Sequence, residues 1–340
     1  MESELNTKTP VALKDLISCP ADGSELALQS GKYRCAENGH QFEESESGLP
    51  LLYWPTDDPT LDGITDLVKE FYEDNPFPSY DSIDSAQTLE ARARAGFFAR
   101  LLNEQIPFGE TILEAGCGTG QLSNYLGLRW GRSVIGADLC LNSLHMGEQF
   151  RNQNEISQVS FCQMNLFRPP FRKESFDTVI SNGVLHHTFD PHGAFDSIAT
   201  LVKPGGHILI GLYNRFGRIS TVARRHIFRI TRGRFRFLDP HLRRSDLSDQ
   251  RKNIWFADQY LHPQESLHTL DEVLGWFDSA GFDFVSSIPK PRIADTFSRD
   301  EKLFDPISPG THADRILTQI GSAFTTGREG GLFIVIGKKK

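Results

Sequence analysis

The sequence predicts an α/β protein built on a doubly wound, mostly parallel β-sheet, preceded by a small β-rich module and interrupted by a basic helical insert. Three observations support this fold class. From residue 111 onward, β-branched apolar segments of strand length alternate with helical segments, which is typical of a parallel sheet. A glycine-rich turn follows the first of these strands. The charge is segregated along the chain, with a net of −13 over residues 1–85 and +9 over residues 211–252.

The order of the elements follows from their apolar periodicity. Short strands are expected within residues 11–54, then a polar linker at 55–62 and helices at 64–74 and 86–105. The strands of the main sheet are expected at 111–115, 133–137, 159–164, 176–181, 207–212, 282–287 and 331–337. The helices between these strands are expected at 120–126, 143–150, 191–201 and 270–279.

The composition excludes several classes of protein. Of the 340 residues, 39% are hydrophobic and 24% are charged, which is ordinary for a globular protein and too apolar for a disordered one. The apolar runs fall short of the ~18 residues of a membrane-spanning helix, so we expect no membrane span. The polar, acidic first ten residues do not resemble a secretory signal. Five scattered cysteines indicate no disulfide framework, so the cytoplasm is the expected compartment.

The glycine-rich turn contains Gly116, Gly118 and Gly120 and lies between the first strand and the first core helix. Glycine there allows a positive φ and a close approach of the backbone to a ligand. A dinucleotide-binding turn has the spacing G-x-G-x-x-G, whereas Gln121 stands here in place of the third glycine. The carboxylate of Glu114, two residues before the turn, would repel a pyrophosphate but suits an ammonium group. The motif therefore favours a ligand with an ammonium and a sulfonium over one with phosphates.

Polar residues also follow the next three strands. Asp138 stands at a strand tip, where a carboxylate can accept hydrogen bonds from ribose hydroxyls; capping of the next helix is the alternative. Asn165 follows the third strand, and its amide can bond an adenine edge. Asn182 ends the fourth strand, and His186 and His187 follow it. A neutral imidazole is a good general base near pH 7, so either histidine is a candidate catalytic residue, with core packing as the alternative.

Together these motifs resemble the class I S-adenosylmethionine-dependent methyltransferases, in particular the type 11 group, over residues 111–212. The resemblance implies S-adenosyl-L-methionine as cofactor and a seven-stranded, Rossmann-like sheet whose last strand is inserted antiparallel. It implies that Glu114 and the glycine turn hold the methionine moiety, Asp138 the ribose, and Asn165 the adenine, although the family more often has Asp at position 165. The implied cofactor-binding residues are Glu114, Gly116, Gly118, Gly120, Asp138, Leu139, Asn165, Leu166 and Asn182.

The expected activity is methyl transfer to a small-molecule acceptor. An RNA base methyltransferase and a non-catalytic, partner-binding protein are the alternatives. Amine-targeting nucleic-acid methyltransferases often carry [D/N]-P-P-[F/Y/W] after the fourth strand, but residues 181–184 here read Ser-Asn-Gly-Val. We expect five parts: residues 1–60 (module and linker), 61–110 (helical lid), 111–213 (cofactor-binding core), 214–265 (basic substrate cap) and 266–340 (completion of the core).

The N-terminal module contains Cys19, Asp22, Cys35 and His40, a pattern that resembles a zinc ribbon in which one cysteine is replaced. Similar modules precede the catalytic domain in some ribosomal-RNA guanine methyltransferases, and others act as separate activator proteins. A structural zinc normally takes four Cys or His ligands and only three are present, so we expect no metal. We expect an apolar core instead, formed by Leu26, Leu28, Tyr33, Phe42, Leu49 and Leu51. The remaining cysteines are expected to be buried as small hydrophobic residues: Cys117, Cys140 and Cys162.

The basic insert, residues 215–252, includes an amphipathic helix followed by a basic-aromatic turn. Four interpretations are open: a pocket for an anionic small molecule, a docking surface for RNA, an interfacial helix that meets a lipid-soluble substrate, or a partner for the chain's own acidic N-terminal module. The apolar stripe of this helix is formed by Ile219, Val222, His226, Ile227 and Ile230.

Overall fold

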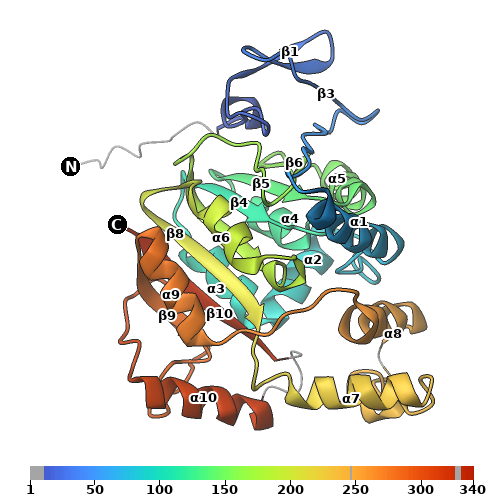
Figure 1. Cartoon of the computed structure of the whole chain (residues 1–340), viewed down its shortest axis with the longest axis vertical. Helices are drawn as coiled ribbons and strands as arrows, with labels where there is room; N and C mark the ends of the chain where they lie inside the picture. Colours follow the sequence, from blue (N-terminus) through green and yellow to red (C-terminus); the bar gives the residue numbers. More distant parts are fainter. Residues whose placement is uncertain (1–10, 246, 326–330) are drawn as a thin grey trace. The chain divides into compact units, whose positions relative to one another are not determined.

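The computed structural model describes residues 11–245, 247–325 and 331–340 (Figure 1). The chain forms two compact units that alternate along the sequence. The first unit contains the chain up to Asp57, Ser82–Ile180 and Ser197–Ile208. The second unit contains Asp58–Asp81, Ser181–Asp196 and Leu209–Lys340. The division into five functional parts expected from the sequence stays a prediction.

The main sheet has seven strands, in the order β6-β5-β4-β7-β8-β10-β9 (Figure 1). In the first unit, β4 pairs in parallel with β5 and β7, and β5 pairs in parallel with β6. In the second unit, β10 pairs antiparallel with β9. The predicted fold class is therefore confirmed, including the antiparallel insertion of the last strand. The strands are β4 (Thr111–Ala115), β5 (Ser133–Asp138), β6 (Val159–Gln163), β7 (Phe176–Asn182), β8 (Val202–Tyr213), β9 (Phe282–Ile288) and β10 (Leu332–Lys339).

The N-terminal module is a three-stranded antiparallel sheet of β1 (Leu26–Gln29), β2 (Lys32–Cys35) and β3 (Gln41–Glu43), after a 3-10 turn η1 (Leu13–Asp15). The prediction of a buried Leu28 is wrong: its side chain is 53% exposed, because it lies beside the β1–β2 turn on an edge strand. Leu51 is half-buried, and Leu52 is fully buried beside it. The other predicted core residues are buried: Leu26, Tyr33, Phe42 and Leu49.

The helices of the first unit are α2 (Ala86–Ala95), α3 (Phe97–Gln105), α4 (Gln121–Gly127) and α5 (Leu141–Gln153). The sequence predicts one helix over 86–105, but Gly96 has φ −93° and ψ 131° and separates α2 from α3. Ser85 begins α2 with a capping box that includes Thr88. The apolar period continues across Gly96, so periodicity alone does not reveal the break.

Close packing around Phe161 requires glycine at three positions of the first unit. A Cβ added to Gly136 on β5 would lie 2.5 Å from the Phe161 ring, and one added to Gly120 would lie equally close. A Cβ on Gly147 of α5 would meet the Thr119 carbonyl oxygen at 2.7 Å. These glycines let the glycine turn and α5 lie against β5 and β6.

We therefore expect Gly136→Ala to destabilise the protein by roughly 1–3 kcal/mol, because the added methyl group overpacks a closed interior. Gly275→Ala is the matched control. Gly275 lies inside α9, where an added Cβ meets nothing within 4 Å, and alanine there should stabilise the protein by up to about 1 kcal/mol. Denaturant unfolding of both variants measures the difference. Equal stability of the two variants would contradict the packing described for Phe161.

The helices of the second unit include two that the sequence did not predict, α8 and α10. Helix α1 begins at Pro59, inside the stretch predicted as a linker, because the Asp58 side chain accepts a hydrogen bond from the Thr60 amide at 2.8 Å. Among the residues that the structure describes, no helix combines the length and apolar character needed to cross a membrane. The helices are α1 (Pro59–Asp74), α6 (Pro191–Ala199), α7 (Ile219–Ile230), α8 (Asp249–Phe256), α9 (Leu270–Ala280) and α10 (His312–Thr325), with short turns η2 (Leu185–His187), η3 (Arg236–Leu238) and η4 (Ala257–Leu261).

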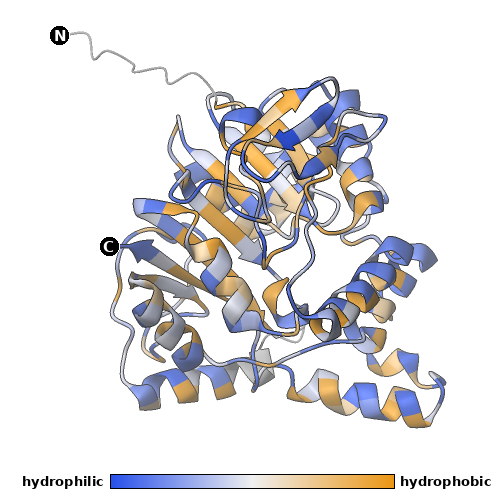
Figure 2. Cartoon of the chain, turned by 45° about the horizontal axis from the view of Figure 1, so that its top comes forward, coloured by the Kyte–Doolittle hydropathy of each residue, from blue (hydrophilic) through white to orange (hydrophobic). Residues whose placement is uncertain are grey.

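Helix α7 does not bury the apolar stripe that its sequence suggests. Ile219 and Ile230 are 59% and 83% exposed, and Figure 2 shows hydrophobic and hydrophilic residues side by side along this helix. The helix packs instead through Phe228, which forms a core cluster with Phe256 of α8 and Tyr260 of η4. Part of the apolar side of α7 therefore faces solvent.

Candidate functional site

The glycine turn connects β4 to α4 in the first unit. Gly116, Gly118 and Gly120 have φ values of 80°, 52° and 71°, in the left-handed region that favours glycine. The backbone amides of Gly116 and Cys117 donate to the Ala137 carbonyl oxygen at 2.8 and 3.1 Å. The turn is therefore fixed against the end of β5, with a backbone conformation that matches the predicted role.

Glu114 is buried at the end of β4, 7% exposed. Its carboxylate accepts a hydrogen bond from the Ser123 hydroxyl of α4. Burial, with a smaller contribution from the nearby charge of Asp138, raises the pKa of this carboxyl to about 8. A cation placed next to Glu114 would stabilise the ionised form, as expected for a carboxylate that binds an ammonium group.

Asp138 ends β5 and faces the glycine turn. One carboxylate oxygen accepts from the Gly118 amide at 2.7 Å, and the other accepts from the Cys140 amide at 2.9 Å, just before α5. Asp138 thus fixes the turn and the start of the next helix. Each oxygen can still accept another hydrogen bond, so contact with two ribose hydroxyls stays a prediction. Burial raises the pKa of this carboxyl.

Asn165, after β6, is 2% exposed and has an internal role. Its side-chain amide donates to the Trp54 carbonyl oxygen at 2.9 Å and accepts from the Phe167 amide at 3.1 Å. The predicted adenine contact is not tested by these bonds. Leu139 and Leu166 are half-buried beyond the ends of the neighbouring strands β5 and β6, where apolar side chains can contact a flat ring.

The donor set of the first unit fits S-adenosylmethionine. Once ionised, Glu114 would supply a negative charge for an ammonium group, and Asp138 would supply acceptors for a ribose. The positive-φ glycines bring backbone to the ligand without a Cβ. Three cysteines in or beside these segments, Cys117, Cys140 and Cys162, are buried as expected and form no disulfide.

Asn182 lies at the end of β7, in the second unit. Its Oδ1 atom is buried and has no hydrogen-bond partner among the residues that the structure describes. A Cβ on Gly211 of β8 would lie 1.9 Å from this oxygen, so only glycine allows the amide to occupy its place. An unsatisfied buried acceptor is consistent with a ligand contact.

His187 is held in one tautomer. Its Nδ1 lies 2.9 Å from the Gln264 carbonyl oxygen, so Nδ1 carries the proton and Nε2 has the lone pair. Burial lowers the pKa of His187 to about 4, so the ring is neutral at physiological pH. The opposite holds for His262, whose Nδ1 accepts from the Gln264 amide at 3.1 Å and whose proton is therefore on Nε2. The centroids of the His187 and His262 rings are 3.7 Å apart.

His186 has different surroundings. The side chain is fully buried, and neither ring nitrogen has a hydrogen-bond partner within the described part of the chain. The ring packs between those of His187 and Tyr213, with centroids 4.2 and 3.9 Å away. Burial lowers its pKa well below the usual range. Of the two histidines, His187 has the contact that fixes its tautomer, to the Gln264 carbonyl oxygen.

The sequence did not identify the acidic groups that accompany these rings in the second unit. Tyr72 of α1 donates to the Asp258 carboxylate at 3.1 Å, and its ring is 5.2 Å from that of His262. The Arg218 guanidinium lies 3.6 Å above the Tyr213 ring. It also forms a buried 2.5 Å ion pair with Glu265. These residues are distant along the chain, so no short motif marks them.

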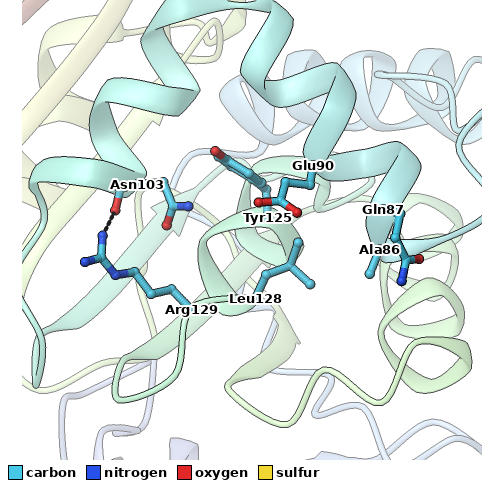
Figure 3. Close-up of a pocket in the computed structure, with 7 residues that line it drawn as sticks. All are labelled: Ala86, Gln87, Glu90, Asn103, Tyr125, Leu128 and Arg129. Atoms are coloured by element: carbon cyan, nitrogen blue, oxygen red, sulfur yellow. Dashed lines mark hydrogen bonds between the residues drawn. The ribbon is translucent and has the colours of Figure 1, made fainter. Parts of the chain in front are cut away.

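A cavity of about 360 Å³ lies in the first unit between α2, α3 and the C-terminal end of α4 (Figure 3). Its lining residues do not include the glycine turn or the strand tips. Helix α4 runs away from the glycine turn, so this cavity is at the opposite end of the helix. The cavity is lined by Ala86, Gln87, Glu90, Asn103, Tyr125, Leu128 and Arg129.

Comparison with known proteins agrees with this geometry. Residues 113–210 match the family described as "Methyltransferase domain". The ubiquinone/menaquinone biosynthesis C-methyltransferase of Pectobacterium carotovorum is 27% identical over 183 residues, covering 52% of this chain and 68% of that protein. The ubiquinone biosynthesis O-methyltransferase of Escherichia coli is 30% identical over 127 residues, covering 36% of this chain and 52% of that protein. This chain spans only about half of the length of several curated relatives that it matches.

Among solved structures, an S-adenosylmethionine-dependent methyltransferase from Mesorhizobium loti is 18% identical, with a TM-score of 0.45, covering 73% of this chain and all of that one. The family match spans β4 to β8, the segment that contains the glycine turn and the strand-tip carboxylates. Residues 113–210 are therefore similar in sequence to a methyltransferase domain.

Proposed function

We propose that the protein transfers a methyl group from S-adenosylmethionine to a small-molecule acceptor. The observation that carries this proposal is the arrangement of Glu114 and Asp138 on the two sides of a positive-φ glycine turn. In this proposal Glu114 binds the ammonium group and Asp138 binds the ribose. Leu139 and Leu166 flank the adenine, while Asn165 fixes the segment beside it.

When bound, S-adenosylmethionine supplies an electrophilic methyl group on a sulfonium centre. The protein then has to align the acceptor, exclude water and remove a proton where the acceptor carries one. We assign proton removal to Nε2 of His187, because its tautomer and its lowered pKa keep that nitrogen unprotonated. Names of relatives that refer to quinone biosynthesis support a small aromatic acceptor with an acidic proton.

The test measures S-adenosylhomocysteine formation by the full-length protein with a panel of phenols, hydroquinones and amines. We expect turnover with at least one phenolic or hydroquinone acceptor. Profiling of a deletion strain fed methyl-labelled methionine then identifies the natural acceptor as a labelled product that disappears. Tight cofactor binding without product from any class, in both assays, would instead support the non-catalytic alternative.

An RNA substrate is the second candidate, supported by the surface that follows α7. Phe235 and Phe237 are 42% and 57% exposed there, among the exposed arginines Arg232, Arg234 and Arg236. Aromatic rings and guanidinium groups together can bind bases and phosphates. RNA retention that falls steeply with salt would favour this candidate, and salt-independent or absent retention would oppose it.

Two further expectations belong to the proposal. One is contact between the acidic N-terminal module and the basic insert. The ion pairs described for insert arginines run to Glu265 from Arg218 and Arg225, and to Glu272 from Arg215. The other is the cytoplasmic location expected from the few scattered cysteines of the sequence.

A further inference from the structure

Four side chains lie close together in the N-terminal module. The sequence predicts no metal there, because only three of the four are cysteine or histidine. The ligand atoms of Cys19, Asp22, Cys35 and His40 all lie within 4.8 Å of one another. Nδ1 of His40 is 3.4 Å from the Cys19 sulfur and 3.3 Å from an Asp22 oxygen, Oδ2. The Cys35 sulfur is 3.3 Å from the same oxygen.

These separations match the edges of a small coordination tetrahedron. With zinc bonds of about 2.0–2.3 Å to nitrogen, oxygen and sulfur, neighbouring ligand atoms of a tetrahedral site are about 3.3–3.8 Å apart. The three measured separations, 3.3 to 3.4 Å, lie in this range.

The ligands come from two tight turns, each of which contains a glycine with a positive φ. In the first turn, the Gly23 amide donates to the Cys19 carbonyl oxygen at 2.7 Å, and Gly23 has a φ of 78°. In the second turn, the Cys35 amide donates to the His40 carbonyl oxygen at 2.9 Å, and Gly39 has a φ of 70°. Each turn thus brings one sulfur and one oxygen or nitrogen ligand to the same point.

The surroundings of the cluster favour its charged forms. The Asn38 amide donates to the Cys35 sulfur at 3.3 Å, and Ser24 lies 2.8 Å from it. The Asn38 side chain donates to one Asp22 carboxylate oxygen at 2.7 Å, and the Ser24 hydroxyl donates to the other at 2.6 Å. Hydrogen-bond donors are therefore already directed at two of the four side chains.

We propose that Cys19, Asp22, Cys35 and His40 form a structural zinc site. Two thiolates and an imidazole select a borderline-soft cation over magnesium or calcium. Four protein ligands complete a tetrahedron and leave no position for a substrate, so the ion has a structural role. Asp22 takes the place of the missing fourth cysteine or histidine.

The site is connected to the segment that follows β6. The His40 ring packs against Trp54, with centroids 4.8 Å apart, and the Trp54 carbonyl oxygen accepts the hydrogen bond from Asn165. The Gln163 amide donates to the Pro50 carbonyl oxygen at 2.9 Å, so the module also extends along β6. If the proposed function is correct, the metal stabilises the segment beside the adenine.

The site is tested by metal analysis and cobalt substitution of the full-length protein, purified with a reductant. We expect one zinc per chain. After exchange with Co²⁺ we expect visible bands of tetrahedral cobalt together with thiolate-to-cobalt charge-transfer absorption. Cys19→Ser and Cys35→Ser should each lose the charge-transfer intensity of one thiolate, whereas Cys162→Ala, the matched control, should keep the full spectrum. Asp22→Cys should add thiolate intensity and hold the metal longer against a chelator.

A folded, reduced protein that contains no zinc and shows no tetrahedral cobalt spectrum would overturn the proposal, as would a native Cys19–Cys35 disulfide. The spectrum of the unchanged protein decides this even if a cysteine variant fails to fold. Chelator treatment should also raise the Kd of S-adenosylmethionine, about fivefold or more. Metal binding without any cofactor binding would refute the proposed function and leave the zinc site standing.

Discussion

Glu114→Gln is expected to weaken S-adenosylmethionine binding by roughly 10- to 100-fold and to leave adenosine binding nearly unchanged. Glutamine keeps the size of the side chain and a hydrogen-bond acceptor for Ser123 but removes the negative charge. A hydrogen bond to a charged group contributes about 1.5–3 kcal/mol, and the ammonium group is present only in the complete cofactor. Calorimetry with both ligands separates the two effects.

Asp138→Ala should weaken both ligands, by a similar factor of roughly 10 to 100, because the ribose is common to them. Its carboxylate also accepts hydrogen bonds from Gly118 and Cys140, so unfolding of the ligand-free variants must be measured alongside. Asp177→Asn is the matched control. Asp177 accepts a hydrogen bond from the Thr111 amide and forms an ion pair with Lys203. Asp177→Asn should therefore lower the stability of the protein without changing its affinity for either ligand. Equal losses of adenosine binding in Glu114→Gln and Asp138→Ala would contradict the assigned roles.

The raised pKa of Glu114 gives cofactor binding a pH dependence. In the free protein this carboxyl titrates at about pH 8, and a bound ammonium group lowers its pKa. Binding below pH 8 therefore releases a proton, and the affinity should rise with pH until it levels off near 8. In Glu114→Gln this rise should disappear. Heats of binding measured in buffers of different ionisation enthalpy report the released proton directly.

The sequence was sufficient for features that depend on neighbouring residues. The alternation of strands and helices and the glycine turn are local patterns, and each was found where it was expected. The break at Gly96 was not predicted, because the apolar period of α2 continues into α3. The exposed stripe of α7 was not predicted either, because Phe228, outside that stripe, is the residue that packs against α8 and η4.

The candidate site was predicted as a set of residue types, and the structure adds their partners. Asp138 has the helix-capping contact that the sequence left open as an alternative, since it accepts from the Cys140 amide before α5, and its contact with a ribose stays a prediction. From the sequence, Cys19, Asp22, Cys35 and His40 could be assessed as metal ligands only by residue type. The distances between their ligand atoms depend on how two turns fold onto each other, which the sequence does not show. The difference between His186 and His187 depends on Gln264, which lies 77 residues after His187.

His187→Gln is expected to lower kcat by up to about 10²-fold, the lower end of the usual contribution of a general base, because a base with a lowered pKa is a weaker proton acceptor, while the Kd of S-adenosylmethionine stays within a few-fold. The base must be unprotonated, and burial holds the pKa of His187 at about 4. The kcat of the unchanged protein at saturating S-adenosylmethionine should therefore not fall as the pH drops from 8 through 6.5, where an ordinary histidine would become protonated. A loss of activity with a midpoint near 6.5 would contradict this environment.

Two further variants separate catalysis from packing. His186→Phe should keep most of the turnover and should not lose stability, because both ring nitrogens of His186 are buried without partners in the described part of the chain. His192→Gln, on the half-exposed side of α6, controls for the loss of a histidine. If His186→Phe removes turnover and His187→Gln does not, the roles are reversed. If neither does, the acceptor needs no base, as for an amine that reacts in its neutral form, and the methyl transfer depends on alignment alone.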